Sequence, residues 1–212
     1  MSEKLCKLPI VYSISGVYSY LNYTNKLVLV SILWYNLHMI ELMILYVLTK
    51  RELTMYSIQK YIEENFGAYS KPSFGAIKPA LVRLEKNNCL TSRKMMSDGG
   101  KLSVFYAITR EGMEELKKLI LESLSENPLQ FLSYARIKLS CASYLDKEEC
   151  ANLFFQIKSM ATKHKFDAEN IINDEYNQLS FYQRIVLDNT ICEYNNFISI
   201  LEGLEKENAR NS

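Results

Sequence analysis

The stretch PSFGAIKPALVRLEKNNCLTSR, residues 72–93, changes from helical to strand character along its length. Its first part places apolar residues on one face of a helix, namely Ile77, Ala80, Leu81 and Leu84. Proline is tolerated in a straight helix only near its start, so Pro79 predicts regular helix from close to Ala76, after a turn over residues 73–75. Residues 90–96 then favour a strand. This switch of hydrophobic period indicates the fold class.

Two helices are expected before this stretch. The segment ELMILYVL, residues 41–48, is apolar almost all round, which predicts a buried first helix over residues 40–48. A second, amphipathic helix is indicated by apolar residues at spacings of 3, 4 and 4, which are Met55, Ile58, Ile62 and Phe66. Thr54 is expected to cap its start, and Gly67 to take a left-handed conformation beyond its end.

A hairpin and another helix are expected after it. The residues SDGG, 97–100, are a strong turn signal, and the alternation that follows indicates a strand with Leu102, Val104, Tyr106 and Ile108 on one face. Thr109 then precedes a helix whose apolar residues step by 3, 4 and 4: Met113, Leu116, Ile120 and Leu124. Asn127 and Pro128 interrupt this helix.

The C-terminal residues predict further helices. Asp146 and Glu149 have capping-box spacing before the apolar segment ANLFFQIKSM. A final helix is expected from about Ser180, with apolar residues at steps of 4, 3, 4 and 3: Leu187, Ile191, Tyr194, Ile198 and Leu201. This face fits either the chain's own core or a seam with a partner. We assign the dimerisation contacts to it.

Three helices, a two-stranded hairpin and a fourth helix have the order of a winged helix-turn-helix. The sequence therefore predicts a mainly α fold with a small β-hairpin. Residues 39–125 form the winged helix-turn-helix DNA-binding domain, and residues 126–212 form a helical C-terminal dimerisation domain. Residues 1–38 are an apolar N-terminal extension, either an extra helix or a segment upstream of a true start at Met39.

A membrane span is not expected. The apolar run over residues 27–37 is too short to cross a bilayer. Extending it to residue 48 reaches spanning length only by including Asn36, His38 and Glu41. With no secretion signal in the first 26 residues, we expect a cytoplasmic protein.

The net charge of +1 is unevenly distributed along the chain. Counted from the sequence, residues 1–49 carry +1, residues 50–111 carry +5 and residues 112–212 carry −5. A basic middle segment predicts that any polyanion, such as double-stranded DNA, is bound there.

Basic and glycine residues of this segment are the candidate contacts. Lys78, Arg83 and Lys86 are expected to project toward DNA, because the opposite face of their helix is in the core. Backbone amides near Ser73 and Gly75 are placed to meet a phosphate at the helix start. A cationic hairpin tip is predicted from Lys94, Gly99, Gly100 and Lys101. Each of these features also fits an ordinary solvated surface.

The sequence shows no pattern typical of a catalytic or metal site. The five cysteines are scattered, with no C-x-x-C pair, and are expected to be reduced thiols: Cys6, Cys89, Cys141, Cys150 and Cys192. Only His38 and His164 could complete a site with them. No nucleophile elbow, zinc-protease motif, P-loop or dinucleotide fingerprint occurs. We therefore expect no enzyme activity, no cofactor and no metal.

Three segments resemble the PadR-like transcriptional regulators in order and spacing: ELMILYVLTKRELTMYSIQKYIEENFG (41–67), PSFGAIKPALVRLEKNNCLTSR (72–93) and DGGKLSVFYAITREG (98–112). The segment SFYQRIVLDNTICEYNNFISILEGLEKE (180–207) is similar to the last helix of the longer subfamily, which has a virulence-activator-like C-terminal domain. The resemblance implies a homodimer whose wings bind spaced half-sites. It usually implies repression, sometimes relieved by a small-molecule effector, here of unknown identity.

This chain departs from the family pattern at three places. Met55 precedes Tyr56 where the family usually has a Gly-Tyr pair, so only Tyr56 carries over as a DNA contact. Lys78 stands where a tyrosine commonly precedes the proline, which makes that contact more electrostatic. Residues 102–104 are Leu, Ser and Val where the wing is usually basic, which leaves Lys101 alone. A protein-binding adaptor that keeps the winged helix without binding DNA is therefore the alternative function.

Overall fold

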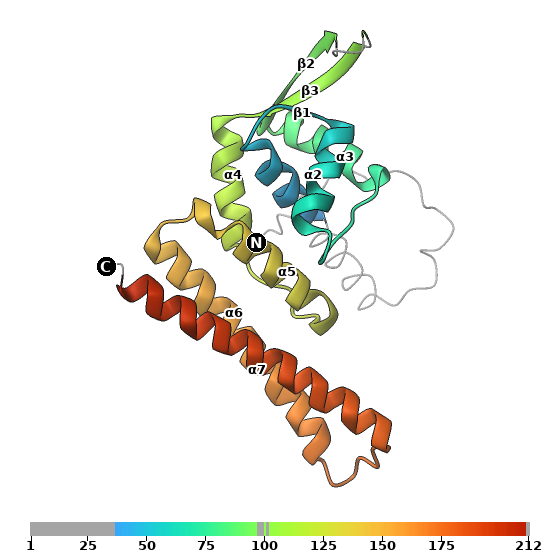
Figure 1. Ribbon diagram of the computed structural model, residues 1–212, viewed down its shortest axis with the longest axis vertical. Coiled ribbons are helices and arrows are strands. Elements are labelled where there is room, and N and C mark those ends of the chain that lie inside the picture. The colour runs from blue at the N-terminus through green and yellow to red at the C-terminus, as the bar shows by residue number, and fades with distance from the viewer. Residues whose placement is uncertain (1–36, 97–99, 101, 211–212) are drawn as a thin grey trace, which may run out of the picture. The chain divides into compact units, whose positions relative to one another are not determined.

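The computed structural model describes residues 37–96, 100 and 102–210, and they are mainly helical (Figure 1). Residues 37–48 are helical. The elements that follow are β1 (Leu53–Thr54), α2 (Met55–Phe66), α3 (Phe74–Lys86), β2 (Leu90–Met96), β3 (Leu102–Ile108), α4 (Arg110–Leu121), α5 (Pro128–Ser140), the 3-10 turn η1 (Ala142–Tyr144), α6 (Lys147–Asn173) and α7 (Phe181–Arg210). The predicted fold class, a winged helix-turn-helix followed by C-terminal helices, is confirmed.

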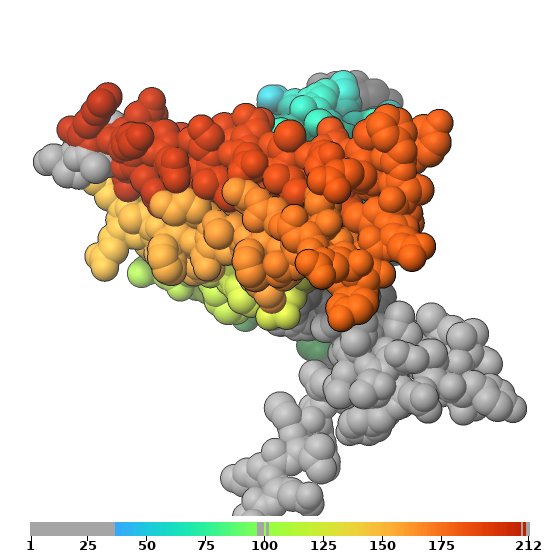
Figure 2. Space-filling view, turned by 90° about the horizontal axis from the view of Figure 1, so that it is seen from below, coloured from blue at the N-terminus to red at the C-terminus, as the bar shows by residue number. Residues whose placement is uncertain are grey.

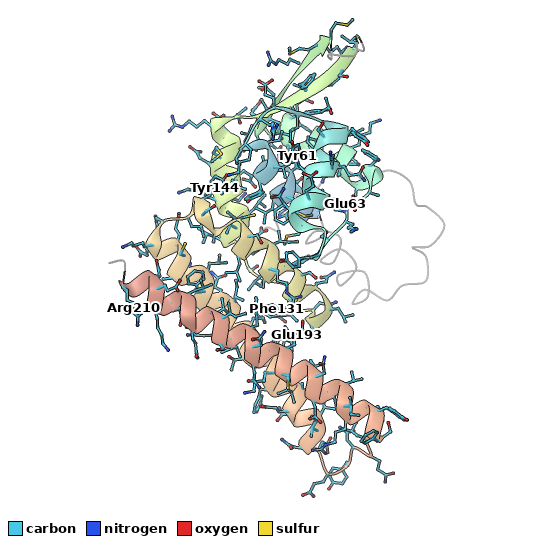
Figure 3. The ribbon with its side chains drawn as sticks, viewed as in Figure 1. Tyr61, Glu63, Phe131, Tyr144, Glu193 and Arg210 are labelled. Carbon is cyan, nitrogen blue, oxygen red and sulfur yellow. The ribbon has the colours of Figure 1, made fainter. Side chains whose placement is uncertain are left out.

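The helix over residues 37–48 is almost completely buried, as its all-round apolar sequence predicts. Its Tyr46 ring packs edge-on against Phe66 of α2, with ring centroids 5.2 Å apart, and against Tyr144 of η1 at 5.9 Å. Thr49, just beyond the helix, shares a 2.6 Å hydrogen bond with the Tyr144 hydroxyl. Tyr144 therefore connects the C-terminal part of the chain to the core of the winged helix (Figure 3).

The sheet has three antiparallel strands in the order β1-β3-β2. The predicted hairpin is confirmed, with Leu90 opposite Ile108 and Met96 opposite Leu102. Gly100 in its turn has φ 72°, a conformation that favours glycine. β1 was not predicted, because two residues are too few to show alternation. It pairs Leu53 with Tyr106 and so covers the second edge of β3.

Two local predictions on α2 and α3 are wrong. Gly67 has φ −60°, a right-handed conformation and not the predicted left-handed one. A larger residue does not fit at this position, because a Cβ there would lie 2.3 Å from the Glu63 carbonyl oxygen. α3 begins at Phe74, two residues before the predicted start, with Pro79 inside it. Pro79 lacks an N–H and follows Gly75 by four residues, so the helix forgoes one hydrogen bond, the one that would reach the Gly75 carbonyl oxygen.

The C-terminal helices start at side-chain caps. Asn127 accepts a 2.9 Å hydrogen bond from the Leu129 amide, with Pro128 at the first position of α5. The predicted capping box of α6 is confirmed: Asp146 accepts from the Glu149 amide at 2.9 Å, and the Asp146 amide donates to the Glu149 carboxylate at 2.8 Å. α6 and α7 lie side by side along most of their length (Figures 1 and 2).

A buried lysine joins α4 to α5. The Lys138 ammonium donates to the carbonyl oxygen of Glu122, the residue that follows α4. Burial lowers the pKa of Lys138 to about 8. Carbonyl groups at a helix end have no partner in the helix and carry partial negative charge, so they suit an ammonium group. This contact fixes α5 against the end of α4.

Two residues predicted for dimerisation lie in the chain's own core. Tyr194 is 3% exposed and Leu201 0%. The Tyr194 ring lies 5.8 Å from the His164 ring of α6 and 6.2 Å from the Phe131 ring of α5. The prediction that Tyr194 and Leu201 face a partner is therefore wrong, because α7 turns this side toward α5 and α6. The other three are half-buried: Leu187, Ile191 and Ile198.

None of the helices over the described residues has the length and apolar character needed to cross a membrane. The predicted N-terminal extension lies outside the described residues except for residues 37 and 38, which are helical. The predicted domain boundaries at residues 39–125 and 126–212 stay predictions.

We predict that Asp146→Ala lowers the free energy of unfolding by about 1 kcal/mol, because it removes one half of the capping box. Urea-induced unfolding followed by circular dichroism measures this change. Ser159→Ala, at an exposed position within α6, is the control and is expected to stay within about 0.5 kcal/mol of the unsubstituted chain. Equal stability of Asp146→Ala and the control would show that the cap is dispensable.

Candidate nucleic-acid interface

The outer face of α3 carries an exposed stripe of alternating apolar and basic side chains. Phe74, Lys78, Val82 and Lys86 follow one another at four-residue steps, and all four are exposed. The opposite face is buried in the core through Ile77, Ala80, Leu81 and Leu84. Because the buried face fixes the rotation of the helix, the stripe has one defined direction. The predicted outward positions of Lys78 and Lys86 are confirmed.

The start of α3 is open to solvent. Ser73 is the N-cap residue, and its side chain makes no capping hydrogen bond. The first helical bonds come from the amides of Ala76 and Ile77, both 3.0 Å from the Ser73 carbonyl oxygen. The amides of Phe74 and Gly75 precede these bonds, and Ser73, Phe74 and Gly75 are all exposed. This geometry suits an anion at the helix start, as the sequence predicts.

An aromatic pair flanks this helix start. Tyr56, in the first turn of α2, is 71% exposed and stacks with Phe74, with ring centroids 6.2 Å apart and an angle of 19° between the ring planes. Tyr56 is thus on the same surface as the α3 stripe. The contact shows that the starts of α2 and α3 lie close together at this surface.

Arg83 does not project outward as predicted. Its Nε donates to Glu41 of the helix over residues 37–48 at 2.8 Å, and only 33% of its side chain is exposed. Glu41 is buried, and burial raises its carboxyl pKa, while the hydrogen bond to Arg83 and the guanidinium charge lower it. The second terminal nitrogen of Arg83, Nη2, is buried without a hydrogen-bond partner in the described part of the chain. Arg83 turns inward because Glu41 needs a cation in the core.

The described wing strands expose more apolar than basic side chains. Lys94 is exposed opposite Val104. Arg93 forms an ion pair with Glu52. The exposed apolar side chains of the hairpin are Met95, Met96, Leu102 and Val104. Gly99 and Lys101 of the predicted cationic tip lie outside the described residues, so the structure adds only Lys94 and Gly100 to that prediction.

The sequence pattern places Val82 on the outward face of α3, but neither Phe74 nor Val82 was predicted as a contact. The role of Glu41 was also missed. Glu41 had a detectable signal, since a single carboxylate in the apolar segment over residues 39–48 requires a basic partner. The identity of that partner depends on tertiary packing, which the sequence pattern does not give.

Comparison with protein families identifies residues 44–118, from the first described helix to α4, as matching the transcriptional regulator PadR-like family. The match covers the winged-helix part of the chain and makes that part similar to the PadR-like family. This match confirms the resemblance expected from the three winged-helix segments. The family that residues 44–118 match is one of transcriptional regulators, as the resemblance implies.

Several solved PadR-like structures are similar to this chain. PadR of Bacillus subtilis in complex with operator DNA has 22% identity, with 79% of this chain and 96% of that chain covered and a TM-score of 0.38. A PadR-like transcriptional regulator from Bacillus cereus has 21% identity, with 82% and 99% covered and a TM-score of 0.36. A PadR family regulator from Clostridium difficile has 28% identity, with 37% and 80% covered and a TM-score of 0.34. None of the curated proteins compared with this sequence matches it.

We predict that Glu41→Gln and Arg83→Met each lower the free energy of unfolding by about 2 kcal/mol, because each leaves a partly buried polar group unpaired. The double variant is expected to lose less than the sum of the two, as measured by urea-induced unfolding.

The exposed pair of Glu52 and Arg93 provides the control, and Glu52→Gln should change stability by less than about 1 kcal/mol. Unchanged stability of Arg83→Met would contradict a structural role and return Arg83 to the surface contacts that the sequence suggested.

Proposed function

We propose that this chain is a sequence-specific, double-stranded DNA-binding transcriptional regulator. The observation that carries the proposal is the outward stripe of α3, in which Lys78 and Lys86 are exposed on a helix held by its opposite face. A helix presented in this way fits the major groove, where basic side chains bind phosphates and guanine edges.

Three neighbouring features support the same surface. The open start of α3, at Ser73 and Gly75, offers amides to a phosphate. Tyr56 stands beside it, and Lys94 extends the positive charge onto β2. The predicted wing contacts Gly99, Gly100 and Lys101 complete the proposed surface. Arg83 is left out of it, because Glu41 occupies its guanidinium group.

A protein-binding adaptor is the second candidate. The observation that favours it is the apolar surface of the described hairpin, which includes Met96 and Leu102, 65% and 61% exposed. A wing that binds phosphate backbones would more commonly carry basic side chains there. The binding measurement below separates the two candidates.

We predict that the double charge reversal Lys78→Glu with Lys86→Glu abolishes specific binding to DNA. The measurement is fluorescence anisotropy with a duplex from the region upstream of the chain's own gene and with a scrambled duplex, over a salt series. The unsubstituted chain should bind the native duplex more tightly, with affinity falling as salt rises.

Lys206→Glu with Arg210→Glu, on exposed positions of α7, changes the charge by the same amount away from α3 and should leave binding intact. Equal weak binding of both duplexes by the unsubstituted chain, indifferent to the α3 substitutions, would favour the adaptor.

We further propose that the regulator is a homodimer and acts as a repressor, by occupying promoter DNA with two wings. Residues 39–125 would bind DNA and residues 126–212 would hold the copies together.

The outer side of the α6–α7 pair carries exposed apolar residues that a partner would cover: Ile171, Tyr182, Ile185 and Val186. A shallow apolar depression of about 450 Å³ lies there, lined by Ile171, Leu179, Tyr182, Gln183, Val186 and Leu187. Leu187, one of the residues predicted for dimerisation, therefore lines this depression.

We predict that Tyr182→Glu with Val186→Glu converts a dimer to a monomer of 24.7 kDa, as measured by light scattering after size exclusion. Two carboxylates in an apolar interface would be buried without partners. Leu129→Glu, at a position 90% exposed on α5, is the control and should keep the dimer mass. A dimer mass for the double variant would exclude this surface, and a monomer mass for the unsubstituted chain would exclude the dimer.

A further inference from the structure

The α3 stripe has an unusual composition for a solvated helix face. Phe74 and Val82 are 39% and 59% exposed, on either side of Lys78. An exposed helix face is normally polar, because the exposure of apolar side chains to water is unfavourable in free energy. Here every second position of the stripe is apolar, and the positions between are basic. The partner of this face should therefore combine apolar groups with negative charge at short spacing.

Phe74 is held in place from outside the core. It is the first residue of α3, and its ring stacks on Tyr56 of α2. The stack limits the directions that the Phe74 ring can take while leaving one side open to solvent. Val82 has a single branch point and few rotamers, so its two methyl groups also have a defined position on the helix. Both side chains thus offer fixed apolar surface.

The major groove of DNA offers one matching apolar group, the 5-methyl of thymine, next to phosphates and the acceptor atoms of guanine. Lys78 lies between the two apolar side chains and suits those acceptors. Eight residues of helix separate Phe74 from Val82, about 12 Å at 1.5 Å per residue. Along DNA this length corresponds to about three to four base pairs at 3.4 Å per step.

We propose that Phe74 and Val82 determine operator specificity by contacting the methyl groups of two thymines, about three to four base pairs apart, that flank the base or phosphate bound by Lys78. Tyr56 acts as a positioning residue for Phe74. This inference rests on the proposed DNA-binding function and goes beyond it by naming the groups in the operator that are recognised.

The test is a scan of a bound duplex with deoxyuridine, which differs from thymidine only by the missing methyl group. The duplex is chosen by footprinting the unsubstituted chain on the region upstream of its gene, and each thymine in the protected segment is replaced in turn. Binding is measured by fluorescence anisotropy at one salt concentration. Loss of one contacted methyl is expected to weaken binding about fourfold, the value for one buried carbon group.

Substitutions at Phe74 and Val82 then assign each methyl to a side chain. Phe74→Ala should weaken binding to the thymine duplex and remove the effect of deoxyuridine at one position. Val82→Ala should do the same at a second position, about three to four base pairs away. Phe74→Leu keeps an apolar side chain and should retain part of the sensitivity. Leu129→Ala, an exposed apolar residue outside α3, is the matched control and should behave as the unsubstituted chain.

The outcomes separate this inference from the function on which it rests. Absence of salt-dependent, sequence-specific binding by the unsubstituted chain would overturn the DNA-binding function itself. Specific binding that is indifferent to deoxyuridine at every position would overturn only the methyl contacts. Circular dichroism first checks that Phe74→Ala and Val82→Ala are folded. The same conclusion would follow if these folded variants weakened binding to thymine and deoxyuridine duplexes equally.

Discussion

The burial of one carboxylate organises the winged-helix core. Glu41 lies on the helix over residues 37–48, whose other faces are packed against the rest of the described chain. A charge in that position is stable only with a close cation, and Arg83 of α3 supplies it at 2.8 Å. The ion pair, on the flank of α3, and the apolar contacts of Ile77, Leu81 and Leu84 both hold α3 against the core. Together they fix which side of α3 faces outward, and the candidate interface depends on that orientation.

The elements could be predicted from the sequence wherever many residues share one period. The hairpin, the second helix and the capping box at Asp146 follow from local patterns that tertiary packing does not override. β1 could not be found, because its two residues pair only through β3. The start of α3 was placed late because Pro79 was expected in the first turn, whereas the helix continues through Pro79 and forgoes one backbone hydrogen bond.

The candidate site was predicted less completely than the fold. Lys78 and Lys86 could be placed because their spacing relative to the buried face decides their direction. Arg83 lies beside the buried face of α3, so its position on the helix does not decide its direction. That direction depends on Glu41, 42 residues away in the sequence. Tyr194 and Leu201 show the same limit, since an apolar stripe on a helix does not reveal whether the chain itself or a second copy covers it. Phe74 and Val82 were not predicted as contacts, because the sequence pattern does not show how much of an apolar side chain is exposed.

The contact between Lys138 and the end of α4 has a mechanical consequence. α4 follows directly from β3 of the wing through Thr109, so the wing, α4 and α5 form a continuous path along the chain. Because Lys138 holds α5 at a carbonyl of the joint itself, α5 cannot rotate about residues 122–127 without breaking this buried bond. A small displacement at the far end of the C-terminal helices would thus act as a lever on the wing. The angle at residues 122–127 would therefore set the direction of α5 relative to α4 and the hairpin.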